Sequence, residues 1–230
     1  MARHRRLQVL NQIHEVGVLP LFYHSDFDIA VEAVKACVSG GGWIIEFLNR
    51  GPGALDTFKS LEKWCSKHLP KTVLGVGSIV DAPTAALFIE SGANFVVSPC
   101  MDEETALLCN KRKIAYLPGC GTLTEIHKAE SLGVEICKLF PGGEVGGPNF
   151  VKAVLGPCSW SSLMPTGGVS PTRESIEPWV RAGVVCVGLG SQLISNEGLE
   201  NKRFDEIEAK MRQCVEIVKS IRLELAEKGV

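Results

Sequence analysis

The stretch Leu132-Gly133-Val134-Glu135-Ile136-Cys137-Lys138-Leu139-Phe140-Pro141 decides the fold, because in it a helical pattern ends at a glycine and a short apolar run follows at once. Glycine accepts the left-handed conformation that closes a helix. The same order recurs at Ser39-Gly40-Gly41-Gly42, Ser91-Gly92-Ala93 and Ala182-Gly183-Val184. The repeating unit of this chain is therefore a helix, a glycine and an apolar strand.

Short apolar runs occur along most of the chain, and continuous runs of this kind are typical of parallel strands buried on both faces. The predicted strands are Val18–Phe22, Trp43–Phe47, Thr72–Val76, Phe95–Ser98, Ala115–Leu117, Ile136–Leu139, Leu163–Pro165 and Val184–Gly188. The predicted helices between them are Phe27–Ser39, Leu55–His68, Ala82–Ser91, Glu103–Lys111, Thr124–Leu132, Phe150–Leu155 and Ser175–Ala182.

About eight such units in a row predict an α/β fold of the closed (β/α)8 TIM-barrel type, as one domain over residues 1–230. A doubly wound open sheet is the alternative, but such sheets usually hold about five or six strands. We expect an N-terminal helix at Leu7–Val16 that plugs the bottom of the barrel. We also expect a long C-terminal helix at Phe204–Glu227, with one apolar face made of Ile207, Met211, Val215, Val218 and Leu223.

Composition excludes several classes of protein. The net charge of the 230 residues is −2, which gives no strong field for nucleic acid or an acidic membrane. Arg3, Arg5 and Arg6 form a small basic cluster that we interpret as a solvated arm or a first helical turn. No apolar stretch approaches the roughly 20 residues of a membrane span. The nine cysteines are scattered without CxxC spacing, which favours small core residues in a reducing cytoplasm over a metal or disulfide site.

Lys138 is the first candidate for a catalytic residue, because its neighbours in the sequence Ile136–Pro141 are apolar on both sides. A desolvated amine loses its charged form more easily, so that its lone pair becomes available to attack a carbonyl carbon. Lys138 is therefore a candidate Schiff-base nucleophile. Alternatively, it extends its amine to solvent from the end of a strand.

In a barrel of this type the chemistry gathers at the carboxyl ends of the strands. Glu46 closes the apolar run Trp43-Ile44-Ile45, and partial desolvation there would raise its pKa toward the range of a useful acid or base. Arg50 follows it with a donor fork suited to a carboxylate or phosphate. An ordinary ion pair for Glu46 and a solvated loop position for Arg50 are the alternatives.

Later strands end in small residues. The third ends in Gly75-Val76-Gly77-Ser78, the fourth in Ser98-Pro99-Cys100 and the fifth in Pro118-Gly119-Cys120-Gly121-Thr122. Thr122 or Thr124 can cap the following helix. Cys120 lacks a nearby histidine that would activate a nucleophilic thiol.

The last two predicted strands end in glycine-rich loops, Pro165-Thr166-Gly167-Gly168 and Gly188-Leu189-Gly190-Ser191. Two such loops after strands seven and eight match the phosphate-binding arrangement common in barrels, where bare N–H groups hold the anion. A desolvated lysine, a carboxylic acid and a remote phosphate anchor together are what aldol cleavage of a phosphorylated keto compound requires.

In this order the motifs Glu46-x-x-x-Arg50, Gly75–Ser78, Ser98-Pro99, Pro118-Gly119, Lys138-Leu139-Phe140-Pro141, Pro165–Gly168 and Gly188–Ser191 resemble the KDPG/KHG aldolase family, from about Val18 to Ile194. The family contains class I aldolases, which are lyases that cleave 2-keto-3-deoxy-6-phosphogluconate or 4-hydroxy-2-oxoglutarate. The resemblance implies a homotrimeric barrel without metal or other cofactor, whose products are pyruvate and glyceraldehyde 3-phosphate or glyoxylate.

The resemblance also implies a role for each matching residue. Lys138 would form the Schiff base and Glu46 would move protons through water. The substrate-binding residues would be Arg50 and Ser78 at the pyruvate carboxylate, Pro99 as a wall, and Thr166, Gly167, Gly168, Gly190 and Ser191 at the phosphate. The sequence departs from the family pattern at Leu48, where the family often has threonine, and in the loop Pro141–Gly147, while Ser78 keeps the hydroxyl that the family has as serine or threonine. The shifted Glu144, and Leu189 between the last glycines, bear on substrate length and stereochemistry.

Two other functions remain open from the residues themselves. One is a different phosphate-binding barrel enzyme, a sugar-phosphate decarboxylase or isomerase in which Lys138 acts only through its charge. The other is a non-catalytic sensor of sugar phosphates on the same scaffold.

Overall fold

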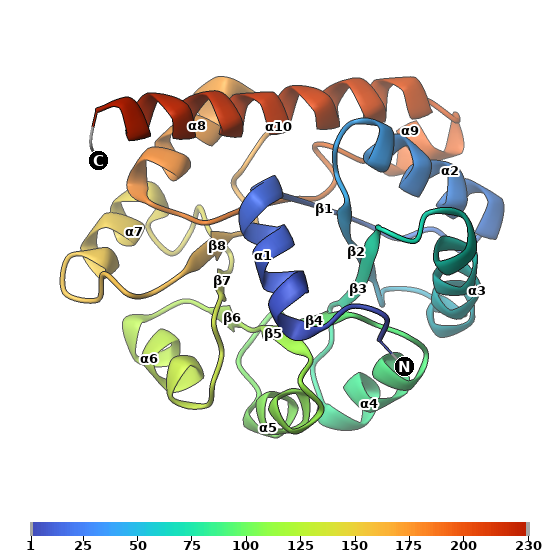
Figure 1. Cartoon of the computed structure of the whole chain (residues 1–230), viewed down its shortest axis with the longest axis horizontal. Helices are drawn as coiled ribbons and strands as arrows, with labels where there is room; N and C mark the ends of the chain where they lie inside the picture. The colour runs from blue at the N-terminus through green and yellow to red at the C-terminus, as the bar shows by residue number, and fades with distance from the viewer. Residues whose placement is uncertain (1, 229–230) are drawn as a thin grey trace.

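The computed structural model describes residues 2–228, in which parallel strands alternate with helices (Figure 1). The strands are Val18–Phe22 (β1), Ile44–Leu48 (β2), Val73–Gly77 (β3), Phe95–Val97 (β4), Ala115–Leu117 (β5), Gly119–Cys120 (β6), Cys137–Leu139 (β7), Leu163–Pro165 (β8) and Val187–Leu189 (β9). The helices are Arg6–Val16 (α1), Phe27–Ser39 (α2), Ala54–His68 (α3), Ala82–Glu90 (α4), Glu103–Arg112 (α5), Leu123–Ser131 (α6), Gly147–Leu155 (α7), Arg173–Ala182 (α8), Asn196–Glu200 (α9) and Phe204–Glu227 (α10).

The strands form a curled sheet of six, in the order β5-β4-β3-β2-β1-β9, and a sheet of three, β6-β7-β8. Every pair of neighbouring strands is parallel, as helix crossovers require. The predicted α/β class with a parallel sheet is thus confirmed.

The two sheets meet at both of their edges. Between β5 and β6 stands Pro118, which has no N–H to donate to a ladder, and its carbonyl accepts from Lys138 N at 2.9 Å. At the other edge Thr166, just after β8, forms a bridge with Gly188 in β9. The short strand β6 was not expected, because the proline hides the continuation of the fifth apolar run.

Side chains accept hydrogen bonds from the first backbone N–H groups of most helices. Asp26, Asp81 and Asp102 cap α2, α4 and α5, each accepting from backbone N–H groups of the first turn. Thr122 caps α6 by accepting from Glu125 N at 3.2 Å, as one of the two predicted threonines.

Alternate strand residues point into the space that the strands enclose. Leu19, Ile44 and Val73 belong to an inner apolar cluster, together with Val9 and Ile13 from α1. All three strand residues lie near the amino ends of their strands, and α1 crosses the middle of the strands in Figure 1. The prediction that the first helix plugs this end is therefore confirmed.

The C-terminal helix α10 covers the predicted residues, but part of its predicted buried face is wrong. Ile207, Met211 and Val218 are buried, whereas Leu223 is 57% exposed. Ile221 is buried in its place, because residues two positions apart on a helix lie about 200° from each other. The last predicted strand was also placed too early: β9 begins only at Val187.

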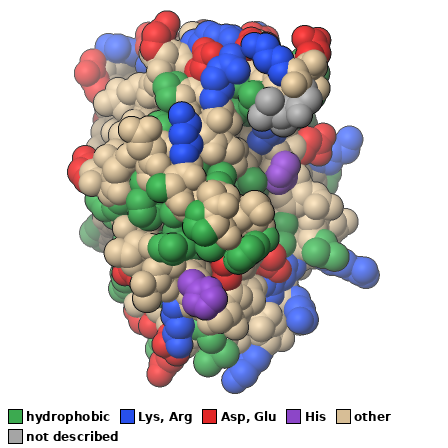
Figure 2. All heavy atoms as spheres, turned by 90° about the vertical axis from the view of Figure 1, so that its left-hand side faces the viewer, with side chains coloured by type: hydrophobic (Ala, Val, Ile, Leu, Met, Phe, Trp, Pro, Cys, Tyr) green, Lys and Arg blue, Asp and Glu red, His purple; other side chains and the backbone are tan. Residues whose placement is uncertain are grey.

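Figure 2 shows hydrophobic side chains gathered across the middle of one face, which carries the elements drawn on the left of Figure 1, among them α6 and α7. Trp160, between α7 and β8, is 70% exposed and borders a hollow of about 490 Å³ with His127 and Val134. Across residues 2–228, no helix combines the length and the apolar character needed to cross a membrane.

Candidate active site

The amine of Lys138 and the carboxyl group of Glu46 are both buried. Lys138 lies in β7 and is 4% exposed, and Glu46 lies in β2 and is fully buried. Neither carboxyl oxygen of Glu46 has a hydrogen-bond partner within the described part of the chain. A buried polar group without a partner costs about 1–3 kcal/mol, so these atoms mark a place where a ligand or water is expected to bind.

Burial favours the neutral form of each group and therefore shifts the two pKa values in opposite directions. Desolvation lowers the pKa of Lys138 below its ordinary 10.5, assisted by the nearby Arg50 charge and opposed by Glu46. Desolvation likewise raises the pKa of Glu46 above its ordinary 4.5, opposed by the Lys138 and Arg50 charges. The arrangement therefore favours an uncharged amine, which is nucleophilic, near a protonated carboxyl group, which is a general acid.

Two glycines make room for the buried polar groups. A Cβ atom on Gly77 would lie 1.5 Å from Glu46 Oε1, and one on Gly188 would lie 2.3 Å from Thr166 Oγ1. These positions therefore admit no larger side chain unless Glu46 or Thr166 moves. Their role was missed in the sequence; the available signal was a glycine at an inward-facing position of an otherwise apolar strand.

The two residues expected to hold a carboxylate are joined to each other. Arg50 Nε donates to Ser78 Oγ at 2.7 Å. Ser78 has a φ of +60°, an uncommon backbone conformation for a residue other than glycine, asparagine or aspartate. Backbone strain of this kind is concentrated at functional sites. Since the Ser78 hydroxyl accepts from Arg50, its own hydrogen remains available to donate.

Pro99, which is expected to form a wall of the pyruvate site, lies beside β6, the strand that pairs with the strand of Lys138. Its carbonyl oxygen would be 2.0 Å from a Cβ on Gly119, and Gly119 is paired with Lys138 across β6 and β7. The structure thus brings Pro99 close to the reactive strand. Cys120, by contrast, belongs to a second, outer apolar cluster, which contains buried helix residues such as Val34 and Phe58.

The residues expected to bind phosphate form two adjacent loops. Gly167 and Gly168 have φ values of +85° and +76°, which favour glycine. The loop after β7 donates two hydrogen bonds to the loop after β8 and so holds it in place. Gly142 N donates to Thr166 O at 2.9 Å, and Gly143 N donates to Gly167 O at 3.2 Å. Thr166 Oγ1 is buried without a partner among residues 2–228.

Backbone groups at these loops remain free to bind an anion. The N–H groups of Gly168 and Ser191 donate to no acceptor in the described part of the chain. Adjacent bare N–H groups are the usual means of holding an anion without a lysine. Leu189 does not line the predicted phosphate site, since its buried side chain belongs to the outer cluster. Glu144 is exposed on the loop after β7.

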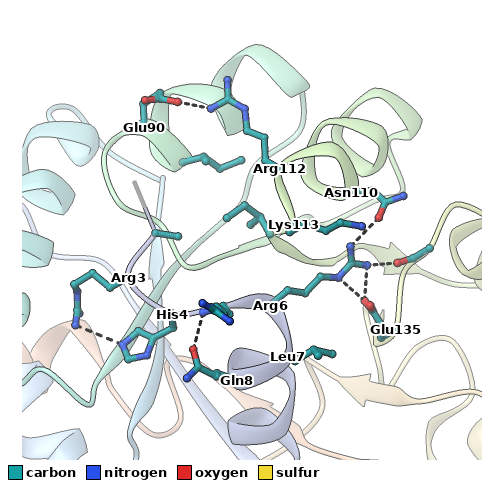
Figure 3. A pocket seen from close by; sticks show the side chains of 15 residues that line it. Arg3, His4, Arg6, Leu7, Gln8, Glu90, Asn110, Arg112, Lys113 and Glu135 are labelled. Carbon is teal, nitrogen blue, oxygen red and sulfur yellow. Dashed lines mark hydrogen bonds and ion pairs between the residues drawn. The ribbon is translucent and has the colours of Figure 1, made fainter.

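A larger hollow, of about 1320 Å³, contains none of the predicted site residues (Figure 3). It is lined by residues 2–8 and by the ends of α4 and α5. Arg3 Nε pairs there with Glu62 at 2.6 Å, and Arg6 Nη2 pairs with Glu135 at 2.7 Å. The expectation of a solvated basic arm is therefore wrong for Arg3, while Arg6 does begin the first helical turn.

The family of KDPG and KHG aldolases matches residues 9–210 of this chain. The chain belongs to this family. It is 30% identical over 199 residues to the KHG/KDPG aldolase of Escherichia coli (strain K12), covering 86% of this chain and 91% of that protein. It is 31% identical over 198 residues to the 2-dehydro-3-deoxy-phosphogluconate aldolase of Pseudoalteromonas atlantica, covering 86% and 89% of the two chains.

Solved structures agree with this family assignment. The 4-hydroxy-2-oxoglutarate aldolase/2-deydro-3-deoxyphosphogluconate aldolase from TTHB1 superposes with a TM-score of 0.78 at 28% identity, covering 91% of this chain and 98% of that one. A KDPG aldolase from Legionella pneumophila, crystallised with pyruvate as a covalent carbinolamine, shares the fold with a TM-score of 0.80 at 24% identity, covering 87% and 95%. The expected family and the lyase class are thus confirmed, and the decarboxylase or isomerase alternative gains no support.

Proposed function

We propose that Lys138 is the Schiff-base nucleophile of a class I aldolase that cleaves 2-keto-3-deoxy-6-phosphogluconate, 4-hydroxy-2-oxoglutarate or both. The observation that carries the proposal is the buried amine of Lys138, close enough to the unpartnered carboxyl group of Glu46 for each group to shift the pKa of the other. Family membership and the names of the relatives add to it.

The reaction begins with attack of the Lys138 lone pair on the C2 keto carbon. The resulting carbinolamine loses water when Glu46 gives it a proton, so that the C–N bond becomes an iminium and the negative charge remains on Glu46. Through a bound water, Glu46 then takes the proton of the C4 hydroxyl. The C3–C4 bond breaks, its electron pair moves into the iminium to give an enamine, and the aldehyde leaves. Protonation at C3 and hydrolysis release pyruvate and restore the amine.

Two anchors fix the substrate in this proposal. Arg50 and the Ser78 hydroxyl bind the carboxylate next to the keto carbon, while Pro99 walls the pyruvyl group. Gly168 N–H and Ser191 N–H, with Thr166, Gly167 and Gly190 around them, bind the remote phosphate. Remote binding of this kind can be used to orient the reacting bond. The iminium is itself the electron sink, so the chemistry requires no metal or other cofactor.

The proposal includes the architecture and assembly that the family resemblance implies. The two meeting edges of the sheets support a single closed (β/α)8 barrel over residues 1–230. A homotrimer is proposed, in which Leu87 and Leu107, 57% and 43% exposed on α4 and α5, are candidates for the interface. Light scattering is expected to give the mass of three copies of the 24.8 kDa chain. The seven buried cysteines are compatible with the proposed cytoplasmic location.

Trapping with borohydride tests the proposal. Incubation with pyruvate and borohydride is expected to add one reduced pyruvate to Lys138, located by peptide mass spectrometry. Cleavage assays with phosphorylated gluconate and galactonate derivatives, and with 4-hydroxy-2-oxoglutarate, then define the substrate. An adduct on another lysine, or none at all, would contradict the assignment of Lys138.

A further inference from the structure

The aromatic ring of Phe140 lies next to the amine of Lys138. The Nζ atom is 4.9 Å from the centroid of this ring. Phe140 comes directly after the end of β7, two positions after Lys138, and is half-buried. Phe140 N donates to Cys120 O at 3.2 Å, which fixes the backbone that carries the ring.

We propose that Phe140 is a catalytic residue of the Schiff-base reaction, whose ring stabilises the positive charge of the iminium on Lys138 Nζ. The inference rests on the proposed function. The face of an aromatic ring attracts a cation within about 6 Å of its centroid, and the attraction is larger where water is excluded. Lys138 is only 4% exposed, so the nitrogen is largely excluded from water.

The ring favours a charged state of this nitrogen over an uncharged one. The free amine is uncharged and so is the enamine, whereas the iminium carries a full positive charge on the same nitrogen. When the amine and the keto carbon condense, the C–N bond forms, the C–O bond breaks, and one proton from Glu46 leaves with the oxygen as water. The new charge therefore appears beside Phe140, which favours iminium formation without tightening the binding of the keto acid itself.

The other charged groups near this nitrogen have different effects. Glu46 attracts a cation on Nζ and Arg50 repels it, as their opposite effects on the pKa of Lys138 show. Neither group excludes water as an apolar ring does. The Phe140 ring both attracts a cation and excludes water, because it is apolar and needs no hydrogen bond of its own.

Stepwise fluorination of the Phe140 ring tests the inference. Fluorine withdraws electron density from the ring face while keeping its shape, so one, two and three fluorines at position 140 weaken the attraction in steps. Each protein is titrated with pyruvate and reduced with borohydride, and intact mass gives the fraction of adduct. The pyruvate concentration for half-maximal trapping is expected to rise steadily, by about 2- to 30-fold over the series. Phe88, buried in the outer core, receives the same fluorines as a control and is expected to give no change.

The outcomes separate this inference from the proposed function. Equal trapping at every level of fluorination, with the adduct still on Lys138, would overturn the role of Phe140 alone. Absence of a Lys138 adduct in the unsubstituted protein would overturn the proposed function. Phe140→Leu and Phe140→Tyr extend the test, since leucine keeps an apolar side chain without a ring and tyrosine keeps the ring. Weaker trapping is expected in the leucine variant only.

Discussion

At the amino ends of the strands, the buried carboxylate of Glu62 receives two hydrogen bonds from Arg3, at 2.6 and 3.1 Å. At the carboxyl ends, the carboxyl group of Glu46 is buried more deeply and has no partner within residues 2–228. Burial raises the pKa of both groups, and at Glu62 the hydrogen bonds from Arg3 oppose the rise. The difference indicates that one end is built for stability, while the other keeps a costly polar group free for a ligand.

Replacing Lys138 by methionine should have the largest effect on the catalytic end. Without the amine no iminium forms, and turnover should fall by at least about 10⁴-fold, as for other nucleophile deletions. The midpoint of thermal unfolding should stay the same or rise, because a buried amine is removed. Lys128→Met is the matched control, since Lys128 is 49% exposed and pairs with Glu103 on the surface. Turnover in Lys138→Met close to that of this control would refute the assignment.

Glu46→Gln should slow turnover by about 10²–10⁴-fold, because the amide cannot donate or accept the proton. It should also change the pH dependence. In its ionised form Glu46 raises the pKa of Lys138, so at pH values where Glu46 is ionised its replacement by glutamine lowers that pKa. Iminium trapping should then persist to lower pH than in the unchanged protein. Borohydride trapping across a pH series measures this. A shift of the trapping curve to higher pH would show that Glu46 does not act on the amine as proposed.

Gly77→Ala should reduce turnover by about 10²-fold, since displacing a catalytic group by about 1 Å can have this effect. The new methyl group would lie 1.5 Å from Glu46 Oε1, so the carboxyl group must move. Gly156→Ala is the control, because its new atom would meet nothing closer than 3.6 Å. Rates of single turnover with both variants make the comparison, and equal rates would show that Glu46 need not occupy its observed position.

Much of the catalytic end could be predicted from the sequence, because its signals are local. An apolar run around Lys138 predicted a buried amine, and glycine-rich loops after late strands predicted a place for phosphate. The roles of Gly77, Gly188 and Phe140 depend on which neighbours face them, and strand pairing decides this. The strand after Pro118 was missed because the proline interrupts the apolar run. The exposure of Leu223 was missed because it depends on which face of α10 packs against α2 and α8.

The amino end shows the limit most clearly. Arg3 was interpreted as solvated, because its partners Glu62, Thr72 and Asn94 are 59 or more residues away in the chain. No local pattern joins such residues. Only the folded sheet brings the N-terminal segment against α3 and the start of β3.

Arg3→Ala should have the smallest effect on activity and still destabilise the fold, which is the opposite of the changes at the catalytic end. Glu62 would remain buried without its cation, at a cost of about 1–3 kcal/mol in the free energy of unfolding. Its pKa, already raised, would rise further, and a protonated carboxyl group no longer needs the cation. The loss of stability should therefore be largest near neutral pH and shrink as the pH falls.

Urea unfolding at several pH values measures this dependence, and turnover should stay within about twofold of the unchanged protein, since none of the predicted site residues lines the hollow beside Arg3. Arg212→Ala removes a 54% exposed partner of Glu208 and is expected to change stability by no more than about 0.5 kcal/mol. If Arg3→Ala behaved like Arg212→Ala, the pairing at the amino end would be incidental. Strong loss of turnover in Arg3→Ala would instead mean that the two ends are coupled through the strands.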